Sequence, residues 1–267
     1  MITFEARQKP LQYAGIIERK AHNIYPHISC SKLDKRYIHA YSEHKFPVDV
    51  LDRIYEKVIV KLRELRAGLR NTDVFYTDLI YGLQEKKVGN CFEEAVLAEL
   101  IGKLNGQKNI YVGNIFVKKE NVENKRKIDH CVAFITDKKI QPKEEYSFKN
   151  KEAIIIDPWL GITDYADKYF TQLKNHFRKY FDELPNQDFL EYLIGSESKN
   201  SEEFRQGRKN SCQDLKFNIE LAHNLNLNTS KQKVYKSFFP ELVIKKYKKI
   251  KLAEPNKTKP IAKKESL

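Results

Sequence analysis

The stretch NCFEEAVLAELIGKL at residues 90–104 decides the fold of this 267-residue chain. Asn90, followed three positions later by Glu93, forms a capping-box pattern that begins a helix. Helix formers continue to Asn105-Gly106, which is a helix stop. Apolar residues fall on several faces of this helix, so we expect it to be central and largely buried. Cys91 then occupies its first turn.

Three apolar, β-branched runs follow the helix, at residues 109–117, 128–136 and 153–159. Charged connections separate them, and this pattern predicts neighbouring strands of one antiparallel sheet. Because side chains alternate between the two faces of a strand, His130 and Asp157 can meet across adjacent strands. The sequence therefore predicts an α+β fold in which a central helix packs on an antiparallel sheet, with additional helices at its flanks.

Helical spacing of apolar residues predicts these flanking helices. Residues 47–70 carry an amphipathic pattern, and residues 165–184 carry an aromatic stripe that favours core packing over base stacking. Shorter stretches at residues 189–194 and 215–225 also fit helices, separated by a polar loop at 195–210.

The chain divides into four parts on these patterns. We expect a mainly helical extension packed on the core at residues 1–80 and a catalytic core at 81–161. A helical part of the same globular unit follows at 162–243, and a basic, disordered tail at 244–267. The hydrophobic content of 41% is enough for a substantial core in such a unit.

The absence of targeting patterns and the spacing of the cysteines limit the cellular compartments in which we expect this chain to act. The chain shows no apolar leader segment and no run near the roughly 18 apolar residues of a membrane helix. We expect a cytoplasmic protein, or one delivered into a host cytosol without a cleavable secretory signal. The four cysteines are scattered and form no CxxC pair. His130 and Cys131 should point to opposite faces of a strand, so we expect no metal and no cofactor.

The formal net charge of +13 is concentrated near the end of the chain, where nine lysines oppose two glutamates after residue 243. Such a run is typical of a solvated tail, but it also fits an anionic membrane surface or an acidic partner. The lysines that would contact a membrane are Lys245, Lys246, Lys248, Lys249 and Lys251. Nucleic acid is the less favoured partner, because no nucleic-acid-binding motif is visible.

Cys91, His130 and Asp157 combine the residue types of a nucleophilic triad. A thiol in the first turn of a helix is favoured as thiolate by the helix dipole. His130 could take the thiol proton and later give it to a leaving amine, while Asp157 orients the ring. The backbone N–H of Cys91 could donate to an oxyanion, with the side chain of Gln84 or Asn90 as second donor. Each residue taken alone also fits a structural role.

The segments at residues 89–95, 129–132 and 157–159 resemble the Cys, His and Asp motifs of the papain-like/transglutaminase-like superfamily, closest to its bacterial effector deamidases and proteases. The resemblance implies a helix packed on an antiparallel sheet, with Cys91 as nucleophile, His130 as base and Asp157 as orienter. It also implies that Trp159 walls the site, and packing of Trp159 against the central helix accounts for this residue equally well. Phe92 departs from the tryptophan common in such motifs, and residues 137–152 form a charged insertion.

These observations predict a cysteine-dependent enzyme that attacks an amide carbonyl of another protein through a thioester. The bond attacked would be a glutamine side-chain amide or a peptide bond, in deamidation or proteolysis, with transamidation as a third outcome. A non-enzymatic binding or scaffold protein, using the basic tail to hold a membrane or nucleic acid, is the alternative. An inactive member that retains the fold is a further one.

Overall fold

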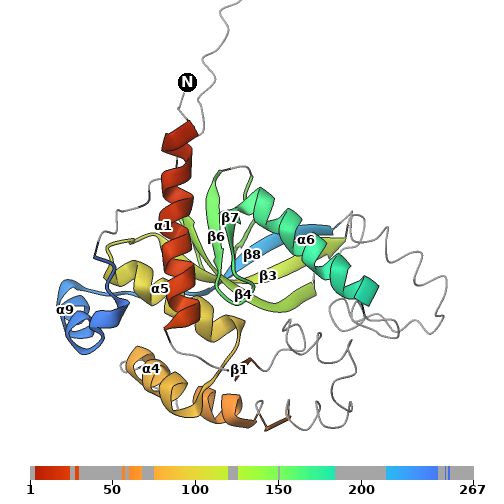
Figure 1. Ribbon diagram of the computed structural model, residues 1–267. Helices are drawn as coiled ribbons and strands as arrows, with labels where there is room; N and C mark the ends of the chain where they lie inside the picture. Colours follow the sequence, from red (N-terminus) through yellow and green to blue (C-terminus); the bar gives the residue numbers. More distant parts are fainter. Residues whose placement is uncertain are drawn as a thin grey trace, which may run out of the picture.

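The computed structural model describes residues 4–24, 28–29, 56–57, 60–67, 75–119, 126–149, 151–183, 215–245, 250 and 252. Within them, a six-stranded antiparallel sheet is combined with helices, so the chain has an α+β fold (Figure 1). The strand order is β5-β8-β3-β4-β6-β7. The sheet consists of β3 (Ile110–Lys119), β4 (Arg126–Thr136), β5 (Glu145–Tyr146), β6 (Ala153–Asp157), β7 (Ile162–Tyr165) and β8 (Leu215–His223).

Helices and short elements complete the described fold. The helices are α1 (Phe4–Asn23), α4 (Phe75–Lys86), α5 (Cys91–Leu104), α6 (Ala166–Glu183) and α9 (Thr229–Phe238), with the 3-10 turn η1 (Pro240–Leu242). A two-stranded parallel pair joins β1 (Ile28–Ser29) to β2 (Val88–Gly89), directly before α5. No helix in the described ranges is long and apolar enough to cross a membrane.

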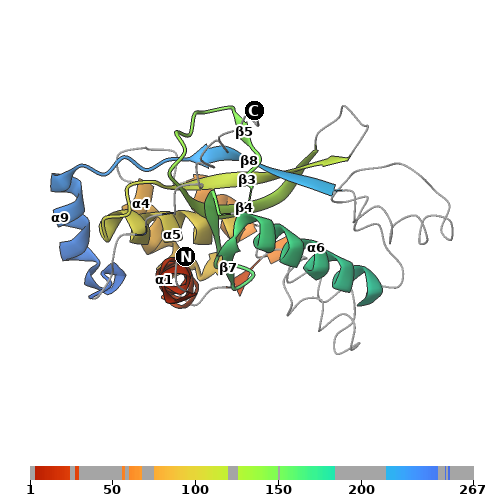
Figure 2. The same ribbon diagram turned by 90° about the horizontal axis from the view of Figure 1, so that it is seen from above.

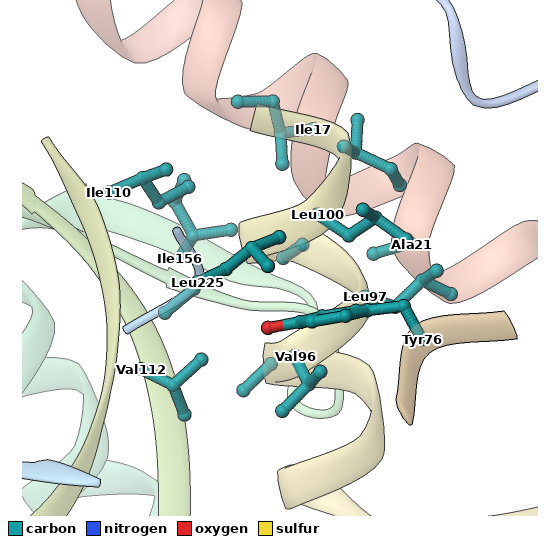
Figure 3. Close-up of a cluster of buried hydrophobic side chains, with 14 of the residues drawn as sticks. Ile17, Ala21, Tyr76, Val96, Leu97, Leu100, Ile110, Val112, Ile156 and Leu225 are labelled. Atoms are coloured by element: carbon teal, nitrogen blue, oxygen red, sulfur yellow. The ribbon is translucent and has the colours of Figure 1, made fainter. Parts of the chain in front are cut away.

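The central helix predicted at residues 90–104 is confirmed as α5. Thirteen of its 14 residues are buried, and the capping box formed by Asn90 and Glu93 is present. Figure 3 shows Ile17 and Ala21 of α1 packed over Leu97 and Leu100 of α5. The helix is therefore covered by α1 on one side and by the sheet on another, which explains why apolar residues surround it.

The three predicted strands are confirmed as β3, β4 and β6, which lie side by side in the sheet. Alternate side chains of β4 enter two different hydrophobic clusters. Cys131, Ala133 and Ile135 pack with α5 and α1, whereas Val132 and Phe134 pack with α6. Strands buried on both faces read as continuous apolar runs, as these do.

The helix predicted at residues 215–225 is wrong, because residues 215–223 form β8 and pair with β3. The segment LKFNIELAH alternates apolar and polar residues, which is the period of a strand. Phe217 and Ile219 are buried on the face covered by α6. Apolar residues at this spacing also fit part of a helix, and the pairing with β3 decides between the two.

The charged insertion at residues 137–152 returns to the sheet. Its short strand β5 pairs with β8, and Phe148 packs on Phe134 with ring centroids 5.6 Å apart. The predicted helix at 165–184 is present as α6, whose Tyr169 and Leu173 are fully buried.

Other predicted segments fall partly or wholly outside the described residues. Residues 60–67 of the helix predicted at 47–70 are helical, with Leu62 and Leu65 buried. The helix at 189–194, the loop at 195–210 and most of the tail predicted at 244–267 lie outside the described residues. Residues 244, 245, 250 and 252 of that tail are described, and Ile250 is buried.

Candidate active site

The capping box of α5 fixes the start of the helix and the position of Cys91. The backbone N–H of Asn90 donates to Glu93 Oε2 at 3.0 Å. The backbone N–H of Cys91 donates to Asn90 Oδ1 at 2.9 Å. The expected oxyanion donor is therefore already bound in this state, so it can serve an oxyanion only after Asn90 releases it.

The carboxylate of Glu93, two residues after the thiol, is paired with the guanidinium of Arg66. It is fully buried and accepts from Arg66 Nε at 2.7 Å and from Arg66 Nη2 at 3.2 Å. This two-point pairing with a guanidinium offsets the cost of burying the charge. The repulsion that a free carboxylate would exert on a Cys91 thiolate is thereby reduced. The sequence offered no signal for Arg66.

His130 and Asp157 meet across β4 and β6, as the strand alternation predicted. His130 Nε2 donates to Asp157 Oδ2 at 2.7 Å, and both side chains are at most 1% exposed. Asp157 also accepts from the hydroxyl of Tyr169 at 2.7 Å and from the backbone N–H of Leu160 at 3.0 Å. Three donors therefore satisfy the oxygens of this one buried carboxylate.

The second ring nitrogen of His130 takes no part in the contact with Asp157. Nδ1 is buried and makes no hydrogen bond of ordinary geometry. Burial lowers the pKa of His130, but the charge and hydrogen bond of Asp157 outweigh it and raise the pKa to about 10, with Cys91 adding to the rise. Asp157 therefore favours the protonated, imidazolium form of His130.

Cys91 is held as a neutral thiol in this state. A hydrogen-bonding contact with Cys131 and burial raise the pKa of Cys91 well above its ordinary value, whereas the contact with His130 lowers it. Cys131 donates its S–H to Asn114 Oδ1 at 3.0 Å, so it can offer Cys91 only its acceptor side. An acceptor beside a thiol favours the protonated form.

Cys131 is a neighbour of Cys91 that strand alternation alone did not predict. His130 and Cys131 are consecutive in β4, yet both interact with the Cys91 thiol. The pairing of β3 with β4 shifts register between Asn114 and Phe116, next to these residues. Such an irregularity re-aims side chains beside a site.

Trp159 and Gln84 differ in where the structure places them. The Trp159 ring lies 5.3 Å from the His130 ring, measured between centroids, at an angle of 54°. Trp159 therefore walls the imidazole. Gln84 lies on α4 with an exposed side chain, whereas Cys91 is only 4% exposed. The structure does not bring Gln84 to the thiol.

Helix α1 covers this cluster. It contacts α5, β6 and β7, and Figure 2 shows it end-on beside α5. Glu18 of α1 is 8% exposed, and the like charges of Asp157 and Glu94 contribute to raising its pKa. Burial raises the pKa of Glu18, while Arg19 and His22 lower it. His22 also lies 3.4 Å from Glu94 Oε2.

Tyr169 belongs to the aromatic stripe at residues 165–184 that is predicted to pack in the core, and its hydroxyl also binds Asp157. A fully buried tyrosine needs a partner for its hydroxyl, and Asp157 supplies it. Replacing Tyr169 by phenylalanine keeps the packing and removes one donor from Asp157. We expect the free energy of unfolding to fall by about 1–3 kcal/mol in urea titrations. A change below about 0.5 kcal/mol would mean that this hydrogen bond contributes no net stability.

The sequence matches no protein-family model, no curated protein and no solved structure. The site must therefore be interpreted from its own geometry. Within the described part of the chain, no group of three or more His, Cys, Asp and Glu side chains could hold a metal ion.

Proposed function

We propose that this chain is a cysteine-dependent acyl-transfer enzyme, with Cys91 as nucleophile, His130 as acid and base, and Asp157 as the group that orients His130. The observation that carries the proposal is the buried His130–Asp157 pair, whose imidazole interacts with the Cys91 thiol at a helix start. The same three roles recur in cysteine enzymes on unrelated folds.

The protonation states imply an order of events. An imidazolium cannot take the thiol proton, so the thiolate forms by loss of the Cys91 proton to water, and the charge of His130 stabilises it. The thiolate then attacks an amide carbonyl and forms a carbon–sulfur bond. His130 gives its proton to the departing nitrogen as the carbon–nitrogen bond breaks, which leaves a thioester and a neutral imidazole.

The thioester is resolved by a second nucleophile. His130, now neutral, takes a proton from an attacking water while the new carbon–oxygen bond forms, and the collapse of this intermediate releases the Cys91 thiolate. A glutamine side chain would yield glutamate and ammonia, and a peptide bond would yield two fragments. An amine in place of water would yield a crosslink.

Within this proposal, the substrate is the amide of another protein, in deamidation or proteolysis, and the fold is papain-like/transglutaminase-like. A helix that begins at Cys91 and packs on β4 and β6 of an antiparallel sheet supports the assignment. The cytosol is the proposed workplace, because Cys91 must remain a free thiol to act.

The test uses β-casein, an unfolded protein rich in glutamine, with dansylcadaverine as a reporter amine. After incubation with wild type, we expect a Cys91-dependent gain of about one dalton per deamidated glutamine, new fragments, or incorporated amine in intact-mass spectra. Cys91→Ala should abolish the change, whereas Cys131→Ala, which removes the other contacting thiol, should retain it. Product formation that survives in Cys91→Ala would contradict the proposal.

A further inference from the structure

A hollow of about 530 Å³ lies on the surface between α1 and the segment that follows η1. It opens to solvent and is separate from Cys91 and His130, which do not line it. Its lining combines three apolar and three cationic residues: Ile16, Arg19, Lys20, Val243, Ile244 and Lys245. A ligand bound in this hollow would therefore not depend on the proposed chemistry of Cys91.

Both walls of the hollow are anchored to α5. On one wall, Asn105 at the end of α5 accepts from the backbone N–H of Ile244 at 2.7 Å and donates to the carbonyl of Leu242 at 3.1 Å. On the other wall, the buried Ile17 and Ala21 of α1 pack against α5 (Figure 3). The hollow is thus held by two elements fixed to the same central helix.

Three positive charges converge on this hollow, and no carboxylate is among the residues that line it. Within the described residues, no ion pair joins Arg19, Lys20 or Lys245 to a carboxylate, and no carboxylate lines the hollow. Arg19 interacts electrostatically with Glu18, the carboxylate next to it in the sequence, but Glu18 is buried and does not line the hollow. A bound anion would relieve the repulsion among the three cations.

The mixed lining selects the chemistry of the anion. Arg and Lys side chains bind phosphate oxygens, and the apolar residues favour carbon chains. An amphiphile with a phosphate head satisfies both, and the open mouth suits a ligand presented by a surface. In the sequence, four further lysines follow Lys245 within six positions. We propose that this hollow binds the phosphate headgroup of an anionic phospholipid and holds α1 against a membrane surface.

The experiment is a flotation assay of the full chain with phosphatidylcholine vesicles, with and without phosphatidylserine. Wild type should float only with phosphatidylserine. The triple variant Arg19→Ala, Lys20→Ala, Lys245→Ala should lose affinity by about fivefold for each charge removed, or roughly a hundredfold in total. These side chains are at the surface, so circular dichroism should show an unchanged fold.

The matched control is Lys139→Ala, Lys233→Ala, Lys236→Ala, which removes the same charge from exposed positions elsewhere. Its affinity should stay within about twofold of wild type, since surface attraction falls off within a Debye length. Equal losses in both triple variants, or no loss in the first, would overturn the proposal.

Calorimetric titration with glycerol phosphate separates the sources of phosphate. Saturable binding that the first triple variant abolishes, without vesicle binding, would assign the hollow to a soluble phosphate compound and overturn the lipid assignment.

Discussion

Replacing His130 by glutamine is expected to slow the alkylation of Cys91 by iodoacetamide at neutral pH by about a hundredfold. The imidazolium is the contact that lowers the pKa of Cys91, whereas Cys131 and burial raise it. A nearby opposite charge changes a pKa by about 1–3 units, and only the thiolate reacts. Glutamine can still donate to Asp157, so the buried carboxylate keeps a partner. The rate is measured by peptide mapping of labelled Cys91.

The control for this substitution is His223→Gln. His223 Nδ1 donates to the buried Glu99 at 2.6 Å, and this pair also contacts Tyr76. It is another histidine–carboxylate pair among the described residues, and it does not enter the interactions that shift the pKa of Cys91. Alkylation of Cys91 should therefore be unchanged. Equal rates in wild type and His130→Gln would show that His130 does not activate the thiol, and the proposed function would fail.

Raising the pH from 6.5 to 9.5 should lower the free energy of unfolding by roughly 3 kcal/mol through His130 alone. The pKa of His130 is about 10 in the folded protein, above its ordinary value of 6.5. Such a group stabilises the fold fully below about pH 6.5, and this contribution is lost as the pH rises toward and through 10. Urea unfolding at the two pH values measures the change.

Asp157→Asn isolates the His130 contribution from other titrations. The charge of Asp157 is what raises the pKa of His130 against burial. Without it, His130 is neutral at both pH values, because burial lowers its pKa. The variant should be less stable than wild type at pH 6.5, and the difference between the two should narrow by about 3 kcal/mol at pH 9.5. A difference that stays constant with pH would contradict a charged His130–Asp157 pair.

Local sequence patterns were enough to predict the helix that carries Cys91 and the strands that carry His130 and Asp157. The capping box, the run of helix formers and Asn105-Gly106 determine α5 within a few neighbouring residues, and they place Cys91 at its start. Alternation within β4 and β6 determines which side chains share a face, and it predicted the His130–Asp157 contact. These features depend on interactions between residues close in sequence, or on the period of a strand.

The tertiary structure alone decided which side chains surround Cys91, His130 and Asp157. Residues 215–223 became a strand because β3 offered an edge for pairing. Tyr169 reached Asp157, and Arg66 reached Glu93, across separations that no local pattern encodes. Cys131 met Cys91 where the β3–β4 register shifts. The sequence by itself thus determined which residues could form a triad. Packing of distant elements decided their charge states, because burial and long-range partners set the pKa of each group.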